Sequence, residues 1–156
     1  MELRPTLTIK KGTRTMSATG LATFDTTVKT TNIWLDELMQ DLHWSDRHKA
    51  YHALRTVLHA LRDRMPVNEA VHLGAQLPML VRGLYYEGWH PAGKPVKERS
   101  RDEFLTHITD AFLFDVNADS KEIACAVLRV LARHVTAGEI DDVKHVLPAG
   151  IRQLCP

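Results

Sequence analysis

Apolar residues recur along this chain at the three- and four-residue spacing of a helix, and the same apolar skeleton occurs twice. Residues 34–84 align without a gap onto residues 104–154 at a constant offset of 70. Nine of the 51 aligned positions are identical, and many of the others pair two apolar residues, as Leu38 does with Ile108. A shared apolar skeleton beneath a divergent surface is typical of two copies of one helical unit.

Each copy is expected to contain four helices. The first covers residues 28–43, with an apolar face through Trp34 and Leu38, and the second follows the Ser45-Asp46 cap over residues 46–65. At 100° per residue, the apolar side chains of the second helix and of its equivalent fall on the same arc. These are Ala53, Leu54, Val57, Leu58, Leu61 and Met65 in the first copy, and Ile123, Ala124, Val127, Leu128, Leu131 and Val135 in the second.

The third and fourth helices have clear start signals. Residues 66–69 place a proline and a glutamate in a first helical turn, where both are tolerated or favoured. At the equivalent position Thr136 and Glu139 have the spacing of a capping box. The Leu-Pro pairs at 77–78 and 147–148 predict the start of a fourth helix in each copy.

The pattern therefore predicts an all-α helical bundle built from two tandem, sequence-related four-helix units that share one core. The expected organisation is a flexible N-terminal leader over 1–27, a first repeat over 28–88, a linker over 89–100 and a second repeat over 101–156. Glycines and prolines in the linker exclude a continuous helix between the repeats.

Composition adds mainly exclusions. Of 156 residues, 44% are apolar and 25% are charged, which is typical of a globular protein that can bury a core without disulfides. The net charge is +1, and because the first 15 residues carry +3, the rest carries −2. This balance indicates neither nucleic-acid nor membrane binding. Two cysteines and no apolar run of membrane length predict a cytoplasmic protein.

Two segments resemble a known family. Residues 74–89, GAQLPMLVRGLYYEGW, and residues 53–61, ALRTVLHAL, together with Glu103-Phe104-Leu105 after the linker, are similar to the bacterial family catalogued as domain of unknown function 2267. The resemblance covers about residues 24–154. It implies a small, helical, soluble bacterial protein, and it supplies no catalytic residue because the family has no established activity.

Nine histidines raise the question of a metal site. His48, His52 and His59 project from one stripe of the second helix, and the first two, at i and i+4, have a spacing that can clamp a metal such as zinc. The stripe lies opposite the apolar arc, and no nearby carboxylate or thiol completes the ligand set. The competing interpretation is a polar helix face that binds metal only adventitiously.

Aromatic residues beside histidines suggest a small-ligand pocket. Two such pairs lie near helix ends and could line a pocket together with two tyrosines, in a set comprising His43, Trp44, Tyr85, Tyr86, Trp89 and His90. The alternative is that the tryptophans anchor the core, which the alignment of Trp44 with Phe114 favours.

No pattern of residues meets the demands of catalysis. Cys125 and His134 share a helix but not a face, and the segment 115–119 lacks the glycine and glutamate of a calcium loop. Asp115, Asn117 and Asp119 are instead expected at a turn and a cap. Basic residues along the helix at 46–65 allow a nucleic-acid-binding face, which its aspartates dilute.

The sequence thus predicts a non-catalytic binding or protein-interaction module, self-associating and without a cofactor. A small-ligand or metal-binding protein, or weak enzyme, that uses the region of His43, Trp44, Trp89 and His90 is the first alternative. Nucleic-acid binding through the basic face of helix 46–65 is the second.

Overall fold

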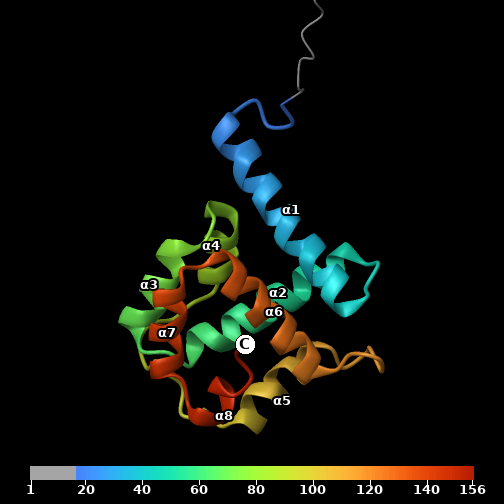
Figure 1. The fold of residues 1–156 in the computed structure, drawn as a ribbon. Helices are drawn as coiled ribbons and strands as arrows, with labels where there is room; N and C mark the ends of the chain where they lie inside the picture. Colours follow the sequence, from blue (N-terminus) through green and yellow to red (C-terminus); the bar gives the residue numbers. More distant parts are fainter. Residues whose placement is uncertain (1–16) are drawn as a thin grey trace, which may run out of the picture.

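The computed structural model describes residues 17–156, and these form eight helices and no strand (Figure 1), which confirms the predicted all-α bundle. None of these helices combines the length and the apolar character needed to cross a membrane. In chain order the helices are α1 (Ala22–Leu42), α2 (Arg47–Asp63), α3 (Val67–Gln76), α4 (Met79–Tyr86), α5 (Arg101–Ala111), α6 (Ser120–His134), α7 (Ala137–Val146) and α8 (Ala149–Arg152).

Helices α2 and α6 cross at the centre of the molecule and contact most of the others (Figure 1). The apolar arcs predicted for these two helices are buried along their whole length. Helices α1 and α5 each pack against both α2 and α6, and α3 packs against α7. The two halves of the chain therefore share one core, whose largest fully buried side chains include Trp34, Tyr85 and Phe104.

Several helices correspond at the offset of 70. Helices α3 and α7 begin and end 70 residues apart, and α4 and α8 begin 70 residues apart. Helix α1 departs from this pattern because it begins at Ala22, whereas α5 begins at Arg101, the position equivalent to Thr31. The first part of α1, residues 22–30, therefore has no counterpart in α5. Duplication of one unit stays a prediction.

The N-terminal boundary differs from the expected one. The first helix was predicted to start at residue 28 and the preceding residues to form a leader, but residues 22–27 already belong to α1. The rest of the predicted leader falls largely on residues 1–16, which lie outside the described part of the chain.

Short polar side chains cap the central helices. Asp46 accepts from the backbone N–H groups of the first turn of α2, and Asp119 accepts from the first turn of α6. The capping box predicted at α7 is only half formed. Thr136 accepts from the N–H of Glu139, but the N–H of Thr136 donates to the side chain of Gln76 at 3.1 Å. The carboxylate of Glu139 lies close to that of Glu69 on α3 instead.

The proposed correspondence of Trp44 with Phe114 is wrong as a structural equivalence. Trp44 is half-buried at the end of α1 and packs against Phe112 and the ammonium group of Lys49. Phe114 is fully exposed in the turn after α5. The gap-free alignment fails here because the connection after α5 covers residues 112–119, whereas the one after α1 covers only residues 43–46.

Candidate functional site

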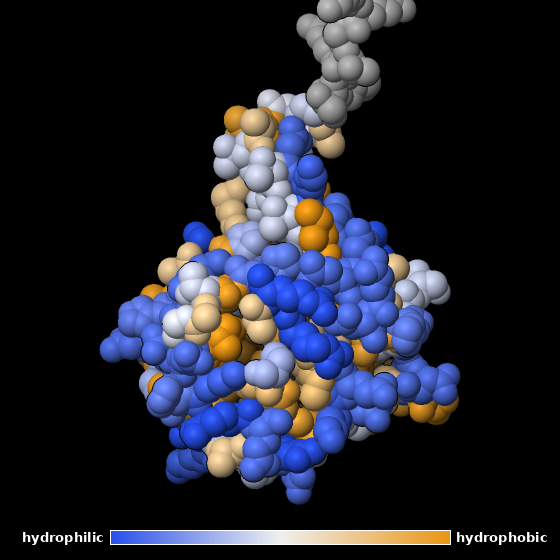
Figure 2. Space-filling view, viewed as in Figure 1, coloured by the Kyte–Doolittle hydropathy of each residue, from blue (hydrophilic) through white to orange (hydrophobic). Residues whose placement is uncertain are grey.

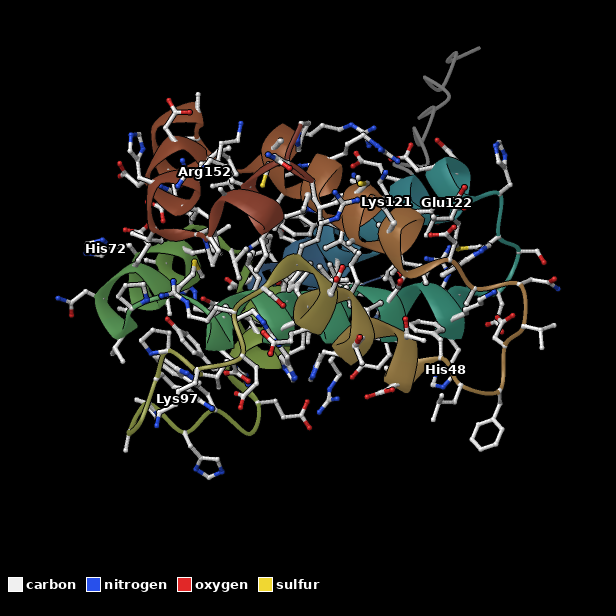
Figure 3. All side chains as sticks on the ribbon, turned by 90° about the horizontal axis from the view of Figure 1, so that it is seen from below. His48, His72, Lys97, Lys121, Glu122 and Arg152 are labelled. Atoms are coloured by element: carbon white, nitrogen blue, oxygen red, sulfur yellow. The ribbon has the colours of Figure 1, made fainter. Side chains whose placement is uncertain are left out.

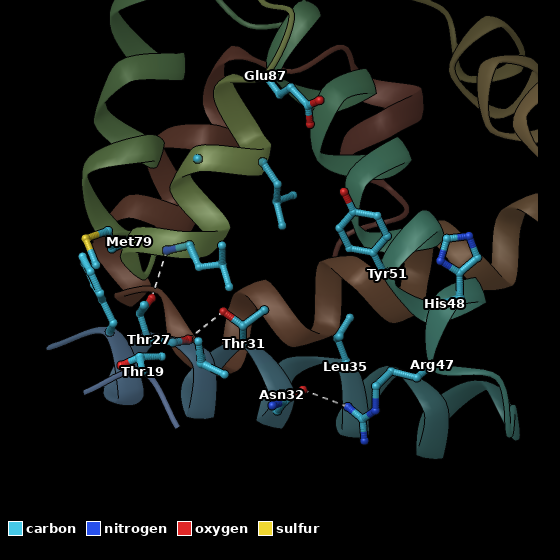
Figure 4. Close-up of a pocket in the computed structure, with 15 residues that line it drawn as sticks. Thr19, Thr27, Thr31, Asn32, Leu35, Arg47, His48, Tyr51, Met79 and Glu87 are labelled. Carbon is cyan, nitrogen blue, oxygen red and sulfur yellow. Dashed lines mark hydrogen bonds between the residues drawn. The ribbon is translucent and has the colours of Figure 1, made fainter. Parts of the chain in front are cut away.

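A groove of about 920 Å³ lies between α1, α2 and α4 (Figure 4). A volume of this size can hold an apolar side-chain cluster or a small molecule. Most of its lining is apolar, and its main apolar contributors are Phe24, Val28, Leu35, Tyr51, Met79 and Leu80.

Polar contacts between helices hold the two ends of the groove. At one end the Oγ1 of Thr27 accepts the backbone N–H of Leu80 at 2.9 Å, so α1 supplies a cap to the first turn of α4. Pro78, at the N-cap of α4, has no side-chain hydrogen bond of its own to offer that turn. At the other end the guanidinium of Arg47 donates to Asn32 (Figure 4), and it also pairs with Asp36.

Apolar side chains remain uncovered on both walls. Phe24 and Val28 of α1 are 49% and 37% exposed, and Met79 and Leu80 of α4 are each 44% exposed. Figure 2 shows the N-terminal part of α1 standing out from the body, with apolar residues on its surface. A contiguous set of half-covered apolar side chains marks an interaction surface.

These exposed residues of α1 continue a regular seam that is buried further along the helix. Apolar or buried positions recur at alternating spacings of three and four, which is the spacing of a coiled-coil seam. The seam comprises Leu21, Phe24, Val28, Thr31, Leu35, Leu38 and Leu42. Its C-terminal part packs against the body, whereas its first three residues are exposed. This spacing is readable in the sequence, but the sequence analysis did not identify it.

The equivalent space in the second half of the chain is closed. Gly150 of α8 occupies the position equivalent to Leu80, and Arg101 of α5 occupies that of Thr31. A Cβ atom added to Gly150 would lie 2.9 Å from the Cβ of Arg101, so α8 and α5 are in close contact. The groove therefore belongs to the first half, where α1 extends beyond the equivalent of the start of α5.

The predicted aromatic–histidine residues fall into separate clusters. Trp44 lies at the turn between α1 and α2, and the adjoining His43, in the left-handed conformation, is exposed. Trp89 stacks on Tyr86 after the end of α4, with ring centroids 5.5 Å apart. Tyr85 is fully buried and its hydroxyl donates to the carbonyl of Ala70, while His90 is exposed. Neither Trp44 nor Trp89 lines the groove or any of four smaller cavities in residues 17–156.

The predicted histidine stripe does not converge on one point. His52 Nε2–H donates to the carbonyl of Ala111 at 2.8 Å, and His59 Nε2–H donates to that of Leu84 at 2.6 Å. These two rings therefore connect α2 to α5 and to α4 instead of facing solvent. His48 is exposed at the rim of the groove (Figures 3 and 4).

The arginines of the predicted basic face have structural partners. Arg62 and Arg64 are buried and donate to backbone carbonyls. Arg47 pairs with Asp36, and Arg55 pairs with Glu87 at 3.2 Å. Two of the four guanidinium groups are therefore withdrawn from the surface, and the other two are paired with carboxylates.

The model of one protein family matches most of the chain. The family model described as "Uncharacterized conserved protein (DUF2267)" matches residues 31–154 of the chain. No curated protein matches it. The matched residues begin at Thr31, so the protruding part of α1, which forms the outer wall of the groove, precedes them.

Proposed function

The chain belongs to the DUF2267 family, whose description names no activity, and we propose that it acts as a non-catalytic interaction module that pairs with a second copy of itself. The pairing uses the groove between α1, α2 and α4. The observation that carries this proposal is the seam of α1, which continues past the body with its apolar residues uncovered.

A second copy is the occupant that matches the seam. Helices with apolar residues at alternating spacings of three and four pack against helices that carry the same pattern. In a two-fold arrangement the same surface patch serves both copies, so each α1 seam covers the apolar wall of the other. Phe24 and Val28 of one copy would then lie against Met79 and Leu80 of the other. The near-neutral chain offers little electrostatic repulsion to such pairing.

The size of the apolar surface predicts a weak dimer. Covering the exposed half of a large apolar side chain contributes about 1 kcal/mol. Four such side chains from each copy contribute about 8 kcal/mol, which alone corresponds to a Kd of about 1 µM. Association also costs about 4–15 kcal/mol in lost motion. At the lowest of these costs about 4 kcal/mol remains, which corresponds to a Kd of about 1 mM, so the dimer is expected to form only as the protein approaches millimolar concentration.

Sedimentation of the full chain over a range of concentrations tests the proposal. The wild-type protein should shift from monomer to dimer as its concentration rises. Val28→Glu should weaken the dimer by at least about tenfold, because it places a charge in the centre of the apolar contact. Ile33→Glu is the matched control, since Ile33 lies on the same helix with similar exposure, 41%, but on the opposite face.

The two variants make the outcome decisive. Dimerisation that Val28→Glu weakens and Ile33→Glu leaves intact supports pairing through the seam. Equal effects of both variants would place the contact elsewhere on the molecule. A wild-type protein that stays monomeric up to about 1 mM would overturn the proposal. If that monomer also bound an apolar dye in the groove, the result would favour the small-ligand alternative.

A further inference from the structure

A cluster of three carboxylates lies between α3 and α7, away from the groove. Glu69 comes from the first turn of α3, and Glu139 and Asp142 come from α7, one helical turn apart. One oxygen from each of these side chains lies within 4.8 Å of the others. The two helices pack side by side (Figure 1). Glu69 and Glu139 are also one of the nine identical pairs at the offset of 70.

The central carboxylate of this cluster is buried without a hydrogen bond to one of its oxygens. Glu139 is 7% exposed, and its Oε1 has no partner in the described part of the chain. The Oε1 of Glu69 is in the same situation. A buried carboxylate oxygen without a hydrogen-bond partner costs free energy. Two such oxygens that face each other therefore call for a bound cation or a shared proton to offset that cost.

Glu139 does not complete a capping box, although the sequence at the start of α7 has the spacing of one. At the start of α5, Ser100 and Glu103 form a complete capping box, in which the glutamate accepts the backbone N–H of the serine at 2.9 Å. The same spacing occurs in Thr136 and Glu139, but Gln76 accepts the N–H of Thr136 instead. The side chain of Glu139 is thereby free to face Glu69.

Little positive charge surrounds the cluster. Among the salt bridges of residues 17–156, one involves these carboxylates, the long contact of 3.9 Å between His72 Nδ1 and Glu69 Oε2. The ring of His72 is 67% exposed and points outward (Figure 3).

We propose that Glu69, Glu139 and Asp142 bind a hard divalent cation of the Mg²⁺, Mn²⁺ or Ca²⁺ class between α3 and α7. Such cations take oxygen ligands at about 2.0–2.6 Å, so two ligands of one ion lie at most about 5 Å apart, as these do. The exposed Asp142 leaves one side of the site open to water, which completes the coordination. The ion would join the two halves of the chain.

Mn²⁺ is a direct probe of this site because the electron paramagnetic resonance signal of the free ion is lost when the ion binds to a protein. Titration of the full chain should show one bound Mn²⁺ per molecule, and Mg²⁺ or Ca²⁺ should displace it. Bound cation should also raise the Tm, since it binds the folded state and not the separated side chains of the unfolded one.

Three conservative variants test the assignment. Glu139→Gln and Asp142→Asn should each weaken Mn²⁺ binding by at least about tenfold. Asp141→Asn is the matched control, because Asp141 is an exposed neighbour on the same helix and outside the cluster. Glu139→Gln keeps the size of the side chain and removes charge repulsion, so it should remain folded by circular dichroism.

The possible results separate the site from its alternatives. Binding that the cluster variants lose and Asp141→Asn retains supports the proposal. Equal weakening by all three variants would mean diffuse attraction to an acidic surface and would overturn it. Absence of binding of Mn²⁺, Mg²⁺ and Ca²⁺ at millimolar concentration would also overturn it and would leave a carboxyl pair that shares a proton. None of these outcomes depends on dimerisation through the groove.

Discussion

Two side chains of α2 bind the last carbonyl groups of α4. The guanidinium of Arg62 donates to the carbonyls of Tyr85 and Glu87, and the ring of His59 donates to that of Leu84. The end of a helix leaves its last carbonyls without intrahelical donors, so these side chains satisfy groups that would otherwise be buried unpaired. At the scale of single residues, these polar side chains of α2 therefore have a structural role, which is to bind the end of α4.

The pH dependence of stability should report the role of His59. Burial lowers the pKa of His59 below its ordinary value of 6.5, because the charged ring loses its hydration. The unfolded chain then binds a proton more readily than the folded one. The stability that His59 contributes is thus present above pH 6.5 and is lost as the pH falls through 6.5 toward the lowered pKa.

We predict that His59→Gln reduces the loss of unfolding free energy between about pH 7 and pH 5. The glutamine amide can still donate to Leu84, but it does not titrate in this range. Urea denaturation at several pH values measures the effect, with His90→Gln, at an exposed histidine, as the control. A profile for His59→Gln that matches the wild-type profile would contradict this role.

The sequence predicted the position of these polar residues on α2 but not their partners. Periodicity places His52, His59 and Arg62 relative to the apolar arc, because that depends only on the helix itself. Their partners lie 23–59 residues away in the chain, on other helices. Nothing in local spacing reveals which helix covers a polar face, so the histidines were interpreted as metal ligands or as a solvated surface.

Equivalent arginines bind the ends of equivalent helices. Arg82 of α4 donates to the carbonyls of Gly74 and Leu77 at the end of α3, and Arg152 of α8 donates to the carbonyl of Leu147 after α7. These arginines are an identical pair at the offset of 70. At the scale of helices, this pair is explained by folding, as the Leu-Pro starts are. The glutamates at 69 and 139 also lie in first helical turns, where the helix dipole favours them, and in addition they face each other between α3 and α7.

Gly150 should be required for the closed contact between α5 and α8. Alanine normally favours a helix over glycine by about 0.5–1 kcal/mol. At Gly150, however, the added Cβ would lie 2.9 Å from the Cβ of Arg101 and close to its backbone, which cannot easily move. We predict that Gly150→Ala lowers the unfolding free energy by about 1–3 kcal/mol.

Gly138→Ala is the matched control for this prediction. Gly138 lies in the first turn of α7, and no atom lies within 4 Å of a Cβ added there. This substitution should leave stability unchanged or raise it by up to about 1 kcal/mol. Thermal denaturation of the two variants compares them directly, and a Gly150→Ala protein as stable as Gly138→Ala would show that α8 adjusts without cost.

The start of α1 was placed too late for a physical reason. Its first ten residues contain several threonines, which have low helix propensity because they are branched at Cβ. In the structure Thr26, Thr30 and Thr31 each donate their hydroxyl to the carbonyl four residues earlier. The helix persists there because Thr27 also binds α4. A pattern read along one helix does not reveal that tertiary contact. For the same reason it did not predict the outer wall of the groove.

Ion pairs connect the two halves of the chain along α1 and α6. Arg129 and Arg133 of α6 pair with Asp41 of α1, and His134 contacts Glu37. Beneath them the ring of His134 stacks on the buried Trp34, with centroids 5.0 Å apart. At the scale of the whole molecule, the first helix of the first half is thus held by the second helix of the second half.

The sequence predicted the class of fold because each apolar arc is a property of one helix. It did not predict that α1 crosses onto α6 or that α5 crosses onto α2. Two copies of one unit can stack side by side, or the helices of each copy can pack against those of the other. The same apolar arcs are buried in both arrangements. The carboxylate cluster depends on that choice, since it lies where α3 of the first half packs against α7 of the second.

Because the halves exchange contacts, neither should fold alone. We predict that fragments 1–92 and 93–156, separated within the linker, each lack a cooperative unfolding transition. In the first fragment α2 would lose α5 and α6, and in the second α6 would lose α1 and α2, which exposes the apolar arcs of both central helices. Each fragment would then bury too little apolar surface to offset the entropy of ordering its chain.

An equimolar mixture of the two fragments should regain helical structure, because the missing contacts are non-covalent and the linker only raises the local concentration of one half near the other. Circular dichroism and thermal denaturation of each fragment and of the mixture measure this. The matched control is the intact chain with a short flexible insertion after residue 92, which should unfold in one transition close to that of the wild type, because lengthening a loop costs little. A cooperative transition in either isolated fragment, with a Tm near that of the intact chain, would mean that the halves are independent domains and that the cation site joins bodies already folded.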